Sequence, residues 1–389
     1  MKVSHSVATS IFTVNFDCAG QSKSKIKKMF RGEQERFETF MRNTLLPSWL
    51  AKSSTQMVIH PLVRAQIVLQ TQSCSRIPED EKLNHFNEKF SAPTLIAVDD
   101  GLFSLWKSFL FNIARSVPTI VVQYVLQKLI FKNVHNENVK IALSAICSDV
   151  LLYPLEVIEV VYMADRSEDG KFVGGQTFQF QSLLDCVIQM YKNANDDLRY
   201  KGQGSDFFST VLSAYYRGFL FRTMCVSVPT HLGTAYLESR LQQGTGVFRL
   251  RDLRKNVKSF YYELSEKMST KDFFVSKFLY IAKVYAMKTL MYLFLYPFDT
   301  VSRKLQVNGQ PGYLNKYESI KDCIVTTFYE ECYENVKDMT INNGFLNGFL
   351  FRSVAIPFTL LLPPLVFKVS QKLFGNKNNS TKKFSLISN

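Results

Sequence analysis

Apolar segments of helix length alternate with polar and charged stretches along this chain. Three of them, at roughly residues 44–59, 139–153 and 278–296, each run into a proline-containing motif. Two further stretches with few charges, Phe109–Phe131 and Ser353–Phe367, lie downstream of such motifs. Because proline kinks or ends a helix, the pattern predicts an all-α protein whose long helices break near one end.

The proline motifs belong to a repeat that occurs three times. The first block of each copy reads HPLVRAQIVLQ at 60–70, YPLEVIEVVYM at 153–163 and YPFDTVSRKLQ at 296–306. A second block follows each one, as SFLFN at 108–112 and GFLFR at 218–222 and 348–352. Recurrence of both blocks in the same order indicates tandem structural units.

Each unit combines an apolar helix, a proline motif, a short surface helix, an aromatic-rich turn and a second apolar helix. The surface helices are predicted at 96–107, 180–192 and 317–330, and the interval 193–210 is predicted as extra loop. Three units give six membrane helices. The chain is therefore divided into a basic extension 1–40, repeats 41–133, 134–243 and 273–375, a basic linker 244–272 and a polar tail 376–389.

Charged residues interrupt the candidate membrane helices, and no stretch of eighteen residues is free of charge. A membrane span normally needs about 20 largely apolar residues. Charges within a span are tolerated where they face a polar interior or a protein partner. A bundle with a polar or protein-filled centre accommodates Lys52, Arg115, Asp149, Lys283 and Lys288.

The formal net charge of +14 is compatible with nucleic acid, anionic lipid or an anionic solute as partner. The basic residues lie at segment ends rather than on one stripe with aromatics, which favours a membrane over nucleic acid. The seven cysteines are scattered and the five histidines form no cluster, so we expect no disulfide framework, metal site or cofactor. No nucleotide-binding or nucleophile motif indicates an enzyme.

The threefold pattern Pro-x-[Asp/Glu]-x-x-[Lys/Arg]-x-[Lys/Arg]-x-Gln resembles the signature of the mitochondrial carrier family over roughly residues 41–375. The matching residues are Pro61, Gln70, Pro154, Glu156, Pro297, Asp299, Lys304 and Gln306. The resemblance implies a mitochondrial carrier fold of six transmembrane helices with pseudo-threefold symmetry, short matrix helices and both termini on the intermembrane-space side. It also implies the mitochondrial inner membrane as location, with the outer membrane as the alternative.

In that family, the acid of each odd-numbered helix pairs with the base of the next, and these pairs close the cavity towards the matrix. Here the acid positions hold Val63, Glu156 and Asp299, and the base positions hold Gln66, Glu159 and Ser302. Glu156 and Glu159 lie on one helix face, where like charges repel. Arg303 and Lys304 lie beside the base position of the third copy rather than at it. The usual matrix gate is therefore predicted not to form.

The opposite gate of the family uses acids on the even-numbered helices. Ten residues after each proline of the second blocks stand Lys128, Ser239 and Phe367, and a shift of one residue gives Arg240 and Lys368. A ring of bases repels, and the nearby Glu238 is a single acid. This gate is also predicted to be lost, so that neither end is closed by ion pairs.

Three arginines, Arg115, Arg222 and Arg352, lie in or near the second blocks. The resemblance places substrate contacts midway along the even-numbered helices, which makes these residues candidates for an anion-binding cluster. The alternative is that they extend to lipid headgroups or pair with Asp149 and Glu156.

Two functions follow from these observations. Loss of both gates favours a degenerate carrier that acts as a structural or accessory subunit, or adaptor, of a mitochondrial membrane complex such as a respiratory-chain assembly. The alternative is an active carrier of an anionic metabolite with a rebuilt gate. Expected partners are anionic membrane lipid such as cardiolipin and other mitochondrial membrane proteins, with a small anionic solute in the second case. The uncleaved extension 1–40, the basic segment 247–259 and the polar tail would supply contacts.

Overall fold

The computed structural model describes residues 41–75, 91–166, 180–200, 206–244, 270–329 and 344–374. Within these ranges six long helical segments alternate with shorter helices. The long segments are α2 (Leu46–Thr71), α5 (Phe109–Leu129), α6 (Glu137–Leu151) with α7 (Tyr153–Ala164), α10 (Phe219–Arg222) with η5 (Thr223–Ser227) and α11 (Val228–Gly244), α14 (Thr270–Val307), and α16 (Phe349–Phe374). The predicted extension 1–40, basic segment 247–259 and tail 376–389 lie outside the described residues.

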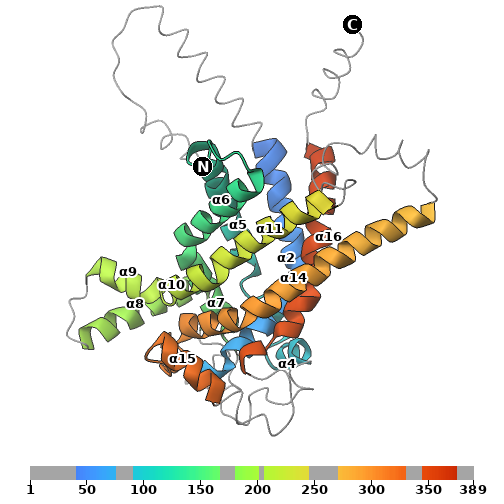
Figure 1. Ribbon diagram of the computed structural model, residues 1–389. Coiled ribbons are helices and arrows are strands. Elements are labelled where there is room, and N and C mark those ends of the chain that lie inside the picture. Colours follow the sequence, from blue (N-terminus) through green and yellow to red (C-terminus); the bar gives the residue numbers. More distant parts are fainter. Residues whose placement is uncertain are drawn as a thin grey trace, which may run out of the picture.

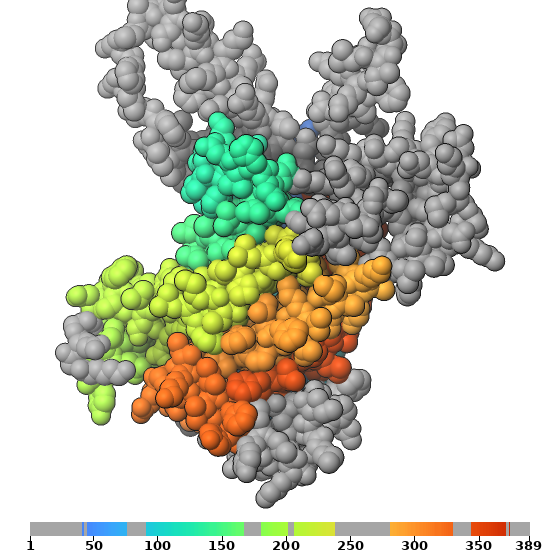
Figure 2. Space-filling view, viewed as in Figure 1, coloured from blue at the N-terminus to red at the C-terminus, as the bar shows by residue number. Residues whose placement is uncertain are grey.

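The six long segments form a closed ring (Figure 1). Around this ring α2 packs on α5, α5 on α6, α6 on α11, α11 on α14, α14 on α16, and α16 on α2. Figure 2 shows one face of it, where α11 and α14 lie side by side. Since α2 begins and α16 ends at the same end of the bundle, the chain crosses the ring an even number of times. The predicted all-α carrier fold is confirmed, whereas the predicted repeat boundaries stay a prediction.

The segments that follow the three signature prolines converge at one end of the ring, here called the signature end. There α2, α7 and α14 contact one another. Pro61 and Pro297 lie inside α2 and α14, which continue through them. By contrast, α6 and α7 meet at an angle of 66° just before Pro154. Proline therefore marks a helix boundary in the second repeat, whereas in the first and third repeats the helix continues past it.

Shorter helices lie beside the signature end. They are α4 (Ala92–Asp99), α8 (Leu183–Tyr200) and α15 (Ile320–Thr326), with bounds shifted from the three predicted surface helices. α8 buries Cys186, Met190, Ala194 and Leu198 at four-residue spacing, which is the pattern of an amphipathic helix. Burial raises the pKa of the Cys186 thiol. Because α8 runs to Tyr200 and α9 (Phe207–Tyr215) follows, the prediction of loop over 193–210 is wrong for the described part of that interval.

By length and composition, two helices of the described residues can cross a membrane, spanning Leu102–Leu129 and Gly344–Ser370. α6 and α7 make a third when the bent pair is counted as one span. The outward-facing apolar side chains Leu110, Leu220, Phe294 and Leu365 are exposed, as on helices that face lipid. The other described segments of the ring do not meet this criterion of length and composition, which suits helices that surround a polar centre.

Each second block begins with a residue in the left-handed backbone region. Gly218 has a φ of 68°, Gly348 has a φ of 82°, and Ser108 has a φ of 72°. Left-handed backbone costs an L-residue about 1–2 kcal/mol. Ser108 is also buried, and its hydroxyl has no hydrogen-bond partner among the described residues. The first repeat is therefore strained where the other two use glycine.

The substitution Ser108→Gly should stabilise the protein by about 1 kcal/mol, because it removes this strain together with an unsatisfied hydroxyl. Gly348→Ala is the opposing control, since a Cβ there would lie 3.0 Å from the Gln66 Cα atom and from the Tyr296 hydroxyl. The thermal unfolding temperature in detergent should rise by several degrees for Ser108→Gly and fall for Gly348→Ala. A lower unfolding temperature for S108G would contradict the assignment of strain.

Candidate functional site

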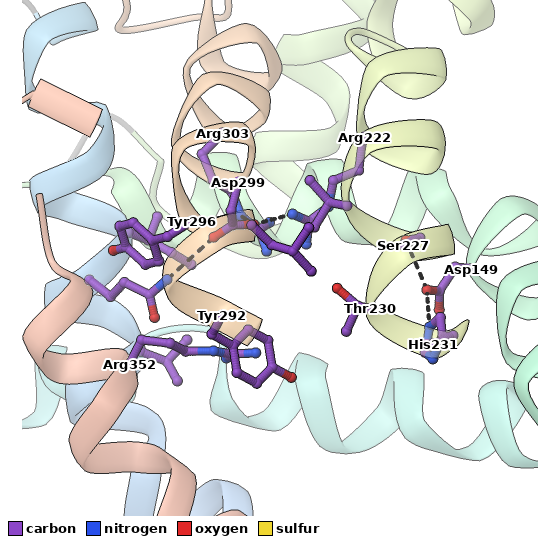
Figure 3. Close-up of a pocket in the computed structure, with 15 residues that line it drawn as sticks. Asp149, Arg222, Ser227, Thr230, His231, Tyr292, Tyr296, Asp299, Arg303 and Arg352 are labelled. Carbon is purple, nitrogen blue, oxygen red and sulfur yellow. Dashed lines mark hydrogen bonds and ion pairs between the residues drawn. The ribbon is translucent and has the colours of Figure 1, made fainter. Parts of the chain in front are cut away.

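A cavity of about 260 Å³ lies inside the ring next to the signature end (Figure 3). Its walls come from α2, α6, α11, α14 and α16, together with α10 and η5. The charged side chains that line it are Asp149, Arg222, Asp299, Arg303 and Arg352. Two of the three arginines proposed from the sequence thus reach one cavity, and the third, Arg115, does not line it.

Arg222 lies between carboxylates of two different repeats. Its guanidinium is 2.9 Å from the Glu156 carboxylate and also forms an ion pair with Asp299. Arg303 lies 3.1 Å from Glu156 and 3.7 Å from Asp299. The four side chains, here called the acid–arginine network, are only 12–17% exposed. Charges held this close in a partly dry site attract strongly, so the network ties α7, α10 and α14 together at the floor of the cavity.

The prediction that no ion pairs close the signature end is wrong. The usual base positions are indeed uncharged or acidic, but two arginines from other positions pair with the acids. Arg222 comes from the second block of repeat two, and Arg303 stands one residue after the base position. Ser302, at the base position itself, contributes a hydroxyl 3.4 Å from Arg222. An arginine side chain is long, so both Arg222 and Arg303 reach the same carboxylates.

Repeat one contributes neutral groups to the network. Gln66 and Gln70 point their amide nitrogens at the Asp299 carboxylate, at 3.5 and 3.2 Å. Gln70 also donates to the Thr300 hydroxyl at 3.2 Å. The base position of repeat one therefore still meets the acid of repeat three, but through an amide rather than an ion pair.

Glu159 has cationic and amide partners of its own on α5. Its carboxylate lies 2.8 Å from the Arg115 guanidinium and accepts a hydrogen bond from Asn112. The predicted repulsion between Glu156 and Glu159 is thereby relieved, because each carboxylate meets a different arginine. Arg115 is a partner of this acid instead of a cavity residue.

The ion pairs near the junction between repeats one and two lie away from the central axis of the ring. Val63 leaves the acid position of repeat one uncharged, and the charges lie further out. Arg64 is 2.7 Å from Asp100, and both side chains are fully buried. Lys107 is 2.6 Å from Asp165 just beyond the end of α7. The first pair joins α2 to the α4–α5 connection within repeat one, and the second joins that connection to repeat two.

The remaining signature residues make buried structural contacts. Gln306 donates to the Tyr153 hydroxyl at 3.2 Å, and that hydroxyl donates to the Arg217 carbonyl at 2.6 Å. Lys304 is fully buried and lies 3.1 Å from the Thr327 hydroxyl, which places it outside the acid–arginine network. We assign these residues to the packing of the signature end.

The predicted loss of the opposite gate stays a prediction. The Lys128 ammonium lies 5.8 Å from the centroid of the Tyr124 ring. The side chains of Glu238, Ser239 and Arg240 lie outside the described residues.

Sequence reasoning missed one polar pair in the cavity. His231 Nε2 lies 2.8 Å from Asp149 Oδ2, and the Ser227 hydroxyl donates to the same oxygen at 3.0 Å. The partners are 82 residues apart, so no local pattern joins them. The available signal was an acid near the end of the apolar helix α6, which requires a polar partner.

Sequence comparisons agree with this architecture. A family model described as "Mitochondrial carrier protein" matches residues 38–138. An ADP,ATP carrier protein of Parachlorella kessleri is 23% identical over 292 residues, which cover 72% of this chain and 72% of the relative. The mitochondrial substrate carrier family protein ancA of Dictyostelium discoideum is 24% identical over 180 residues, 43% of this chain and 55% of that relative.

The comparisons and the helical fold together support membership of the mitochondrial carrier family. In this carrier the signature end is closed by two arginines that stand outside the usual base positions. Its divergence is therefore a relocation of charge at this end instead of a simple loss.

Removing Arg222 should destabilise the carrier, because two partly buried carboxylates would then share Arg303 alone. Loss of one partner of a buried ion pair costs about 3–5 kcal/mol. Arg222→Met should therefore lower the thermal unfolding temperature, and adding Glu156→Gln should restore part of it by removing the excess negative charge. Arg222→Met combined with Glu318→Gln, at an exposed acid, should behave additively. If the changes in unfolding temperature were strictly additive in both double variants, the network would be contradicted.

Proposed function

We propose that this protein is a solute carrier that moves a small anionic metabolite across the mitochondrial inner membrane by alternating access. The observation that carries the proposal is the acid–arginine network at the floor of the cavity. A transporter needs two conformations, each closed on one side and similar in free energy. Arg222 and Arg303 supply closure at the signature end, where the sequence suggested none.

The network is suited to repeated opening. Its members keep some contact with water, since each is 12–17% exposed. The attraction between partly buried charges is largely offset by the cost of removing them from water. The net free energy of separating the carboxylates from the arginines is therefore modest, provided that both groups regain water or bind a solute.

The arginines of the cavity lining favour a solute that carries a carboxylate or another anionic group. Three arginines and two acids face the cavity: Arg222, Arg303 and Arg352 against Asp149 and Asp299. The volume of about 260 Å³ is below the roughly 300–1,000 Å³ of pockets for drug-sized ligands, which favours a small metabolite over a nucleotide.

The role as an accessory subunit or adaptor, expected first from the sequence, has no support from the relatives, which carry the names of carriers. A protein with a structural role is expected to fill its centre with apolar side chains, lipid or a protein segment. The polar, ion-paired cavity favours transport instead. A carrier of this kind performs no bond-making chemistry, so we do not propose an enzyme.

Location and partners follow from the same proposal. Carriers of this family are multi-pass proteins of the mitochondrial inner membrane, and we place this chain there. Anionic lipid, cardiolipin included, remains a proposed partner on account of the net charge of +14. We propose no nucleic-acid partner, metal or cofactor.

Transport is tested with the purified full-length chain in liposomes that contain an unlabelled anion and receive the same anion in labelled form. A suitable panel is phosphate, malate, glutarate, L-glutamate and ADP. At least one should exchange, and Arg222→Gln should slow this exchange at least tenfold because the closed state is lost. Arg199→Gln removes an exposed arginine of α8 and should leave the rate unchanged. Rates equal to those of empty liposomes for the whole panel would contradict the proposal.

A further inference from the structure

The charges around the cavity are separated in space once the internal ion pairs are accounted for. Arg222 and Arg303 face Glu156 and Asp299, so the acid–arginine network holds two charges of each sign. The remaining charged residues of the lining are Arg352 and Asp149. Figure 3 shows them on opposite sides of the cavity, with the network beside Arg352. The cavity thus presents one cation and one anion to a solute.

Arg352 forms the cationic side. Its guanidinium lies 4.6 Å from the centroid of the Tyr292 ring, which holds it by a cation–π contact. Within the described part of the chain no carboxylate lies at ion-pair distance from Arg352. A guanidinium held by an aromatic face keeps its N–H groups for a carboxylate, which it binds with two parallel hydrogen bonds.

Asp149 forms the anionic side. Its Oδ2 accepts hydrogen bonds from the Ser227 hydroxyl and from His231 Nε2. Its other oxygen, Oδ1, accepts none from the residues that the structure describes. The carboxylate is 35% exposed, so Oδ1 can accept a hydrogen bond from a solute. Thr230 lies between this side and the network, where its hydroxyl offers a further polar contact (Figure 3).

We infer that the solute is an amino acid, bound with its carboxylate on Arg352 and its ammonium on Asp149. This inference rests on the proposed function and names the class of its solute. A dicarboxylate would place its second negative charge against Asp149. Inorganic phosphate offers no cation to Asp149. An amino acid satisfies both, and its size suits a cavity of about 260 Å³.

The test compares three pairs of solutes in which an ammonium replaces a hydrogen: L-glutamate with glutarate, L-aspartate with succinate, and L-alanine with propionate. Exchange of each labelled compound is measured with the full-length carrier in liposomes. The amino acid should exchange at least tenfold faster than its partner in at least one pair, because the deaminated partner leaves the Asp149 carboxylate without a cation.

Two substitutions separate the sides of the cavity. Arg352→Gln should abolish exchange of the preferred amino acid, and Arg352→Lys, which keeps the charge, should retain part of it. Asp149→Asn should remove the preference for the ammonium while exchange of the deaminated partner is unchanged or faster. Asp196→Asn, at an exposed acid of α8, is the matched control. Thermal unfolding of each variant identifies any that fails to fold.

The outcomes distinguish this inference from the proposed function. Glutarate or succinate exchanging as fast as its amino acid, with no effect of Asp149→Asn, would overturn the inference while anion transport stands. Exchange of phosphate or ADP alone would overturn it as well. Failure of all these solutes and of the wider anion panel would remove the proposed function itself.

Discussion

One arginine shared between two carboxylates holds the signature end together. Arg222 joins Glu156 of the second repeat to Asp299 of the third, and Arg303 adds a second cation beside them. A planar guanidinium with five donors can bind two acids at once, which a lysine ammonium does less well. The convergence of α7 and α14 brings their two carboxylates together. The arginines keep that convergence from being repulsive, and the cavity lies directly beyond them.

The closure is uneven around the threefold arrangement. Repeats two and three meet through full charges, whereas repeat one adds the amides of Gln66 and Gln70. The attachment of repeat one to repeat two depends on off-axis pairs such as Lys107 with Asp165, whose side chains are 8% and 4% exposed. Buried pairs are costly to break when one partner is removed. We therefore expect the first two repeats to move as one body and the contact of Asp299 with its partners to open first.

The sequence was sufficient for the architecture because its signals are local and recur in register. The aromatic blocks at 108–112, 218–222 and 348–352 lie where the second helix of each pair begins, and the proline motifs lead into the segments that form the signature end. The ion pairs of the signature end were harder to predict, because motif positions do not fix which cation reaches an acid. Arg222 is 66 residues from Glu156, and His231 is 82 from Asp149, so only the packing of helices joins them. The helix α9 was missed because its nine residues are too few for periodicity to distinguish a helix.

The central claim is that Arg222 closes the signature end reversibly. It is tested most directly by distance measurements between spin labels at Lys192→Cys on α8 and Lys321→Cys on α15, two exposed positions in different repeats, in a cysteine-free background. In lipid nanodiscs the protein with Arg222 should give one narrow distance distribution. The Arg222→Gln variant should add a second, longer population, because the tie between repeats two and three is gone. Identical distributions for the two proteins would contradict the account.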